Sequence, residues 1–156
     1  MILSLEKFAT SAQPTVSKRS KTGTNPDPTR ADILLGNGLM DLVRLRVAQV
    51  LGCKRCMREY SATLKREGET DRRLRLLEGW RRETVFTLRE KAALNLAEAV
   101  TKHPFTSIPP KAVYPARVFF TDEQMIFLVL DIVAIHDRHY LKGFLHDDMK
   151  RRPPHE

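Results

Sequence analysis

Residues 39–56 read LMDLVRLRVAQVLGCKRC, and the fold is inferred first from the pattern of their apolar residues. Its apolar residues recur at the three- and four-residue spacing of a helix that buries one face. The residues that set this period are Met40, Val43, Val47 and Val50, and Leu39, Leu42 and Leu51 widen the face. Gly52 interrupts the run, so a second helix is expected to begin at or near Cys53. The pattern predicts a central helix, followed at once by a helix that carries both cysteines.

The composition fits one helical domain. The chain has 156 residues, 42% of them hydrophobic, which is enough for one sizeable core. Helix-forming residues dominate its middle and end, where Gly and Pro are scarce, so the predicted class is all-α. Residues 11–31 are rich in Pro, Ser, Thr and Lys and predict a flexible arm, after a short helix at 2–8. The expected organisation is an N-terminal helix and arm (1–35), a helical domain (36–147) and a basic tail (148–156).

Polar residues mark the starts of two helices in the middle of the chain. Thr70 or Asp71 is expected to cap a short helix that reaches Trp80. Thr87 and Glu90 form a capping box, in which each side chain satisfies a free backbone amide of the next helix. Trp80 is expected to lie in the core or in an interface rather than to contact substrate.

A similar signal opens the last helix. Thr121 and Gln124 repeat the capping device, and the helix that follows is expected to run to about Leu145. Its Ile and Val content is typical of strands, but its length and its cap favour a helix. Residues 104–117, which contain four prolines, predict a loop before it.

The charge and hydropathy exclude some function classes. The net charge is +8, but the basic residues are spread along helices that also carry Glu, so nucleic acid is not expected as a partner. The longest apolar stretch is interrupted by Asp131 and is shorter than the roughly 20 residues of a membrane span. Residues 1–10 lack a continuous apolar segment and predict no secretory signal. The chain is therefore expected to be cytoplasmic, with no membrane partner.

The two cysteines are the residues most suited to chemistry. Cys53 and Cys56 are three positions apart, on one face of the expected helix, which permits a short disulfide. A helix N-terminus with nearby Lys and Arg stabilises a thiolate, so a lowered thiol pKa is expected. Two alternatives stay open: half of a zinc site completed by His136 and His139, and a pair of buried inert cysteines.

Several motifs together resemble a known family. Residues 41–56 (DLVRLRVAQVLGCKRC), Gly68-Glu-Thr, the pair Trp80-Arg81 and residues 86–101 (FTLREKAALNLAEAVT) resemble, in order and spacing, the AhpD-like alkylhydroperoxidase and carboxymuconolactone decarboxylase superfamily. The resemblance covers about residues 36–140. It implies an AhpD-like helical bundle that associates into a homo-oligomer.

The resemblance also implies a reaction. Cys56 would attack a peroxide and become a sulfenic acid, and Cys53, nearer the surface, would resolve it as a disulfide. The substrate would be a peroxide or a small disulfide, and the electrons would come from a lipoyl-protein or a thioredoxin-like donor. The chemistry needs no bound cofactor. Decarboxylation is less expected, because that branch of the superfamily typically lacks the paired cysteines.

The sequence departs from the family at the proton relay. Where the family has Glu and His, this chain has Asp41 and Tyr60. A phenol donates a hydrogen bond but is a poor general base at neutral pH, whereas imidazole is suited to that role. His136 and His139 are candidate replacements for the missing base, and His136 is the one assigned to the site, with Cys53, Cys56, Asp41 and Tyr60.

Each of these residues also has a structural interpretation, which stays open beside the catalytic one. Asp41 is placed to form an ion pair with Arg44 three residues later, and Tyr60 to pack with its hydroxyl satisfied. A histidine on such a helix is often a surface or an interface residue. If the relay has been lost, the chain is instead a non-catalytic redox-responsive or binding protein of the same fold.

Overall fold

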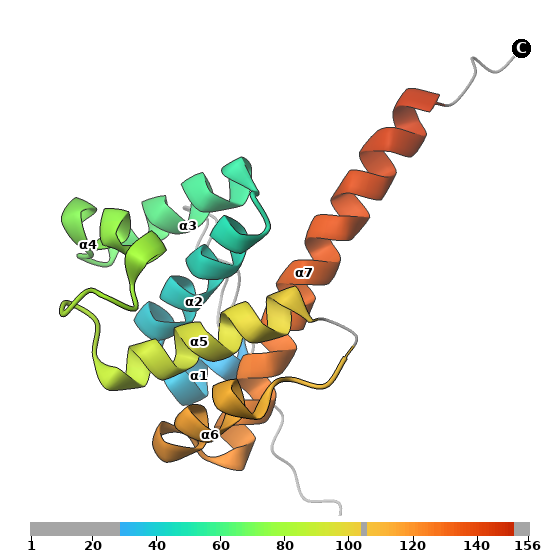
Figure 1. Ribbon diagram of the computed structural model, residues 1–156. Helices are drawn as coiled ribbons and strands as arrows, with labels where there is room; N and C mark the ends of the chain where they lie inside the picture. The colour runs from blue at the N-terminus through green and yellow to red at the C-terminus, as the bar shows by residue number, and fades with distance from the viewer. Residues whose placement is uncertain (1–28, 104–105, 152–156) are drawn as a thin grey trace, which may run out of the picture.

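The computed structural model describes residues 29–103 and 106–151, and within them every regular element is helical (Figure 1). The elements are α1 (Arg30–Leu35), α2 (Asn37–Val50), α3 (Lys54–Arg66), α4 (Asp71–Leu76), the 3₁₀ turn η1 (Leu77–Gly79), α5 (Leu88–Lys102), α6 (Pro110–Phe119) and α7 (Asp122–Arg151). The all-α prediction is confirmed. The helix expected at 2–8, most of the arm and the last five residues of the tail lie outside the described residues. None of the described helices is long and apolar enough to cross a membrane.

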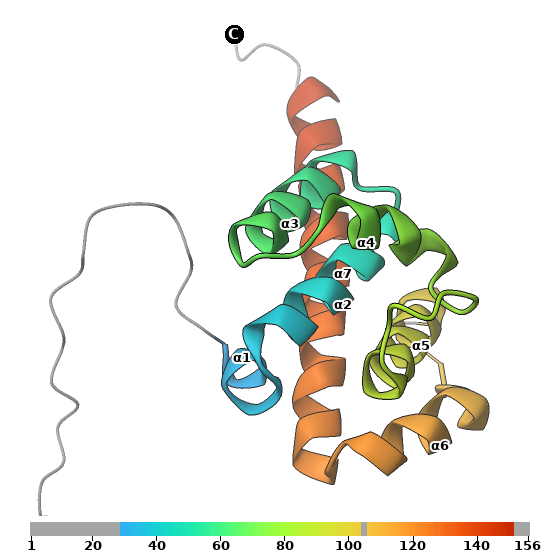
Figure 2. The ribbon, with the colours of Figure 1, turned by 90° about the vertical axis from the view of Figure 1, so that its left-hand side faces the viewer.

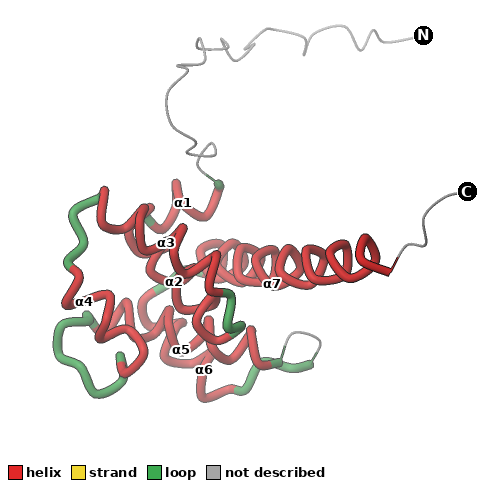
Figure 3. Tube along the Cα trace, turned by 90° about the horizontal axis from the view of Figure 1, so that it is seen from above, coloured by secondary structure: helices red, strands yellow, loops and turns green. Residues whose placement is uncertain are grey.

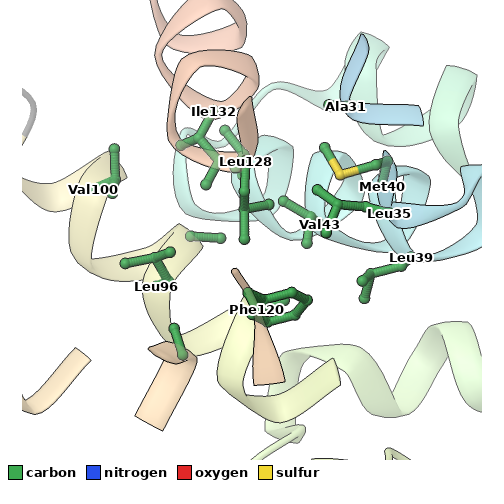
Figure 4. Packing of buried hydrophobic residues seen from close by; sticks show 14 of the residues in the cluster. Ala31, Leu35, Leu39, Met40, Val43, Leu96, Val100, Phe120, Leu128 and Ile132 are labelled. Carbon is green, nitrogen blue, oxygen red and sulfur yellow. The ribbon is translucent and has the colours of Figure 1, made fainter. Parts of the chain in front are cut away.

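Helix α2 is the centre of the bundle, as its sequence period predicts. It packs against α1, α3, α5 and α7, and Figure 2 shows it crossing α7. One face of α2 contributes to a core shared with α1, α5, α6 and α7. In Figure 4, Leu128 and Ile132 of α7 lie between Val43 of α2 and Leu96 of α5.

The opposite face of α2 packs against residues of α3 and α4. Leu42 and Leu45 of α2 join a second buried cluster that includes Leu64 of α3, Leu77 and Trp80. Trp80 is 4% exposed, which confirms the core position expected for it. Because both faces of α2 are covered, its orientation is fixed, and so is the position of the short connection from α2 to α3.

The predicted caps are present. Thr87 and Glu90 form a complete capping box at α5, and the Thr70 hydroxyl accepts a hydrogen bond from the Arg73 amide at the start of α4. At the start of α7 the backbone amide of Gln124 donates a hydrogen bond to the Thr121 hydroxyl over 3.2 Å.

The N-terminal boundary corrects the sequence analysis. The flexible arm was expected to extend to residue 31, but α1 begins at Arg30, with a capping box formed by Thr29 and Asp32. Ala31 and Leu35 are buried in the same core as α2 and α7. The local signal in the sequence is the Thr-x-x-Asp spacing, which the prolines just before it obscure.

The prediction of a loop at residues 104–117 is wrong for residues 110–117, because α6 begins at Pro110. A proline in the first turn of a helix loses no hydrogen bond. Pro115 lies inside the helix and lacks the N–H that would bind the Lys111 carbonyl oxygen. The side-chain amide of Asn95 on α5 donates to that oxygen over 3.3 Å and replaces the missing donor.

Helix α7 is longer than expected. It was predicted to end near Leu145, and it continues to Arg151, so the expected basic tail begins inside the helix. Figures 1 and 3 show that its C-terminal part extends past the other helices. The N-terminal half of α7 packs into the main core. Its middle lies beside the N-terminal half of α3, where residues of both helices line one pocket.

Candidate redox site

The two cysteines lie where α2 turns into α3. Gly52 adopts a φ of 67°, in the left-handed region that favours glycine, and this allows the tight turn between the two helices. The backbone amide of Cys53 donates a hydrogen bond to the Ala48 carbonyl oxygen over 2.9 Å, and this bond links the turn to the last turn of α2. Cys53 is the N-cap of α3, and its sulfur accepts a hydrogen bond from the Cys56 amide over 3.3 Å.

The structure holds Cys53 and Cys56 as a disulfide. Their Cα atoms are 5.3 Å apart, within the range that a disulfide requires. After reduction the two sulfurs remain at the N-terminal end of α3, where free amides and the helix dipole favour a thiolate. Lys54, Arg55 and Arg58 add positive charge to this end of the helix, and Arg55 forms a 2.8 Å ion pair with Glu59.

Cys56 lines a small pocket between α3 and α7. The pocket has a volume of about 60 Å³ and is lined by Cys56, Glu59 and Tyr60 of α3 and by Ile135, Arg138 and His139 of α7. Each helix contributes residues at positions i, i+3 and i+4, the spacing of side chains on one helical face. A pocket of this size accommodates a small substrate or several water molecules beside the sulfur.

Tyr60 is in this pocket, and its environment makes it a hydrogen-bond donor. Burial raises the pKa of its phenol above the ordinary value, and the positive charges of Arg138 and Arg44 only partly oppose this effect. The phenol therefore stays protonated at neutral pH and does not act there as a base.

Asp41 belongs to a buried charge cluster centred on Arg44. The Nη1 atom of Arg44 lies 2.9 Å from Oδ1 of Asp41 and 2.8 Å from Oδ1 of Asp32. Its Nε and Nη2 atoms bind both carboxylate oxygens of Asp131, at 2.9 and 3.0 Å. These residues join α1, α2 and α7. The ion pair between Asp41 and Arg44, one of the two interpretations of the sequence, is therefore present.

The cluster gives its aspartates different protonation behaviour. Burial raises the pKa of Asp41, and Arg44 offsets this only in part. Burial also acts on Asp32, but hydrogen bonds from Arg44 and Thr29 outweigh it and lower the pKa of Asp32. Asp41 is therefore the carboxyl group of this pair that takes up a proton more readily. It affects Tyr60 through its charge but does not line the pocket.

The two candidate histidines occupy different places. His136 is 3% exposed, and its ring lies 4.6 Å from that of Tyr140, outside the pocket lining. His139 is partly exposed and lines the pocket with Cys56. No group of three or more His, Cys, Asp or Glu in the part of the chain that the structure describes is arranged to hold a metal ion.

Three residues that line the pocket were not predicted as site residues from the sequence: Glu59, Ile135 and Arg138. Glu59 shares a helical face with Cys56, so its helical spacing was a usable signal. Ile135 and Arg138 come from a helix distant in sequence, and only the packing of α7 brings them to the pocket.

Comparisons with known proteins agree with this fold. Residues 35–99 match the carboxymuconolactone decarboxylase family. A crystal structure from Agrobacterium tumefaciens superimposes with a TM-score of 0.66 and 26% sequence identity, over 78% of this chain and 81% of that one. Both matches support the resemblance of the chain to the AhpD-like and carboxymuconolactone decarboxylase superfamily.

The similar proteins leave the activity open. The Agrobacterium protein is described as a protein of unknown function and a candidate antioxidant defence protein AhpD. The uncharacterized protein YdfG of Bacillus subtilis (strain 168) is 32% identical over 96 residues. That match covers 62% of this chain and 65% of YdfG, slightly less than two thirds of its length.

Proposed function

We propose that the chain is a thiol-dependent peroxidase or disulfide oxidoreductase that uses Cys53 and Cys56. The observation that carries the proposal is the disulfide at the N-terminus of α3, with Cys56 against a pocket large enough for a small substrate. The match to the carboxymuconolactone decarboxylase family over residues 35–99 and the likeness to a candidate antioxidant defence protein AhpD support the same reaction class.

In the peroxidase reaction the Cys56 thiolate attacks one oxygen of the hydroperoxide. The O–O bond breaks, Cys56 becomes a sulfenic acid, and the alkoxide takes up a proton and leaves as an alcohol. The Cys53 sulfur then attacks the sulfenic sulfur, and water leaves as the disulfide forms. A dithiol donor reduces this disulfide by exchange and is itself oxidised. We propose a lipoyl-protein or a thioredoxin-like protein as this donor.

Steady-state turnover tests this proposal. The reduced full chain is mixed with hydrogen peroxide or tert-butyl hydroperoxide and with dihydrolipoamide or reduced thioredoxin, and peroxide loss is followed. We expect many equivalents of peroxide to be consumed per chain, and no turnover by Cys56→Ser. Cys53→Ser is expected to turn over more slowly than wild type, because its sulfenic acid has no resolving thiol in the same chain and must react with the donor directly.

A second candidate is a redox-responsive protein that does not turn over. It is favoured by the position of Asp41, which contacts Arg44 outside the pocket lining, and by the phenol at Tyr60. Such a protein would form the disulfide once and would show no multiple turnover with either donor. The same assay separates the two candidates, because only the enzyme consumes peroxide continuously.

A further inference from the structure

We propose that His139 of α7 is the acid–base group that exchanges a proton with Cys56. The inference rests on the proposed function and deepens it, because it assigns to another helix the role that the phenol of Tyr60 does not fill. His139 and Cys56 line the same pocket of about 60 Å³, one from each side.

The geometry brings these two residues together through helix packing. Ile135 and His139 are one turn apart on α7, as Cys56 and Tyr60 are on α3, and all four line the pocket. Ile135 is 4% exposed and belongs to the main core, so the face of α7 that carries His139 has a fixed orientation. The ring of His139 also lies 6.2 Å from that of Tyr140, in an edge-to-face arrangement.

The other charged and titratable groups around the pocket fit the role less well. On α3, Tyr60 is a buried phenol and Glu59 is an exposed carboxylate paired with Arg55. On α7, Arg138 carries a permanent positive charge, which stabilises a thiolate but accepts no proton. An imidazole is the side chain whose charge normally changes between pH 5 and 8, so it can both accept and return a proton.

His139 would act twice in one reaction. Its imidazole accepts the proton of the Cys56 thiol, and the resulting thiolate attacks the hydroperoxide. As the O–O bond breaks, the imidazolium gives the same proton to the departing alkoxide, which leaves as an alcohol. The histidine ends the step neutral, and the two electrons have moved from sulfur to oxygen.

The test measures the reactivity of Cys56 as a function of pH. The full chain is reduced in a Cys53→Ser background, and the rate of Cys56 alkylation by iodoacetamide is recorded from pH 5 to pH 9, with and without His139→Ala. His103→Ala is the matched control, because His103 is exposed at the end of α5 and outside the pocket lining. Circular dichroism verifies that each variant is folded.

We expect His139→Ala to lower the alkylation rate at pH 7 at least tenfold and to shift the pH profile to higher pH. General acid–base groups typically contribute about 10²–10⁴-fold, so the effect on peroxide turnover should be at least as large. Added imidazole should restore several-fold of the lost rate, which a purely structural role for His139 does not predict. His103→Ala should match its parent.

An unchanged pH profile in His139→Ala, or a slower rate that imidazole does not restore, would overturn the inference. Two outcomes separate failure of this inference from failure of the proposed function. If the wild-type chain turns over peroxide and His139→Ala does so equally well, only the role of His139 is lost. If the profile shifts as expected but the wild-type chain never turns over, the proposed enzyme is lost and the proton exchange remains.

Discussion

Arg44 is the residue on which the buried charges of the molecule depend. It contacts Asp32, Asp41 and Asp131, and all four side chains are almost inaccessible to solvent. Three carboxylates around one guanidinium leave an excess of negative charge, and this is consistent with the raised pKa of Asp41. Arg44 therefore has two effects: it holds α1, α2 and α7 together, and it limits how far the pKa of Asp41 rises.

Removal of the Arg44 charge should destabilise the fold strongly. We expect Arg44→Met to lower the free energy of unfolding by about 3–5 kcal/mol, because it leaves buried carboxylates without their cation. Urea denaturation at pH 7 measures the loss, and Arg58→Met on the exposed side of α3 is the control. The deficit should shrink at acidic pH, where the aspartates become protonated; a deficit below about 1 kcal/mol at pH 7 would contradict the account.

Glu98 makes the stability of the protein depend on pH. Burial alone would raise its pKa, but hydrogen bonds from Arg81, Trp80 and Arg46 lower it from 4.5 to about 2. The Oε1 atom accepts from the Trp80 indole and from Nε of Arg46, both over 2.8 Å. A carboxyl with a lowered folded-state pKa stabilises the fold above its unfolded pKa, and this contribution is lost as the pH falls through the folded pKa.

Glu98→Gln removes this pH-dependent contribution. At pH 7 we expect a loss of at most about 3 kcal/mol, since each pKa unit corresponds to about 1.4 kcal/mol. The difference from wild type should decrease as the pH falls from 4.5 towards 2, where the wild-type carboxylate also becomes neutral. Unfolding at several pH values measures this, with the exposed Glu78→Gln as control; a difference that does not vary with pH would contradict it.

At the scale of the elements, α6 shows how a helix tolerates an internal proline. The Asn95 amide supplies the hydrogen bond that Pro115 cannot donate to the Lys111 carbonyl. We expect Asn95→Ala to cost about 1 kcal/mol, and to cost less when Pro115→Ala restores the backbone donor. A double-mutant cycle by urea denaturation measures this coupling, and strictly additive effects would contradict the explanation.

Most helix boundaries could be predicted because capping is local. The Thr–Glu and Thr–Gln pairs and Gly52 act on neighbouring residues, and the structure has helices where they indicate them. Helix α6 could not be predicted in this way, because the donor that makes Pro115 tolerable comes from a different helix. The end of α7 was also missed, since the sequence near residue 145 contains no strong helix breaker.

In the candidate site, too, some features follow from the local sequence and others only from the packing of distant helices. The pairing of Cys53 with Cys56 depends on spacing along one helix, so the sequence was sufficient to suggest it. The choice between His136 and His139 depends on how α7 is rotated against α3. Both histidines were named, but His136 was preferred, and it is His139 that lines the pocket. Rotation of α7 is set by the core residues Leu128 and Ile132, not by any local signal.

At the scale of the whole molecule, α7 presents apolar side chains to solvent. Ile126 and Leu130 are 57% and 56% exposed one turn apart, and Ile33 of the adjacent α1 is 65% exposed. Exposed apolar residues that cluster on one face commonly mark an association surface, and most soluble oligomers consist of identical chains. We therefore propose that this face of α7 contacts a second copy of the chain.

Light scattering coupled to gel filtration tests this association. The wild-type chain should elute with the mass of an oligomer, and Leu130→Glu should elute as a monomer, because the buried charge would be uncompensated. Tyr114→Glu, at an exposed aromatic residue of α6, is the control. A monomeric wild-type chain, or an oligomer unaffected by Leu130→Glu, would contradict the proposal.

In the proposed reaction Cys56 is the sulfur that reacts with peroxide, and chemical trapping of its sulfenic acid tests this assignment. The reduced Cys53→Ser chain receives one equivalent of hydroperoxide in the presence of dimedone, and mass spectrometry locates the adduct. We expect a dimedone adduct of the sulfenic acid on Cys56, and none in the reciprocal Cys56→Ser chain. Absence of an adduct on Cys56, or an equal adduct on Cys53 in the reciprocal chain, would contradict it.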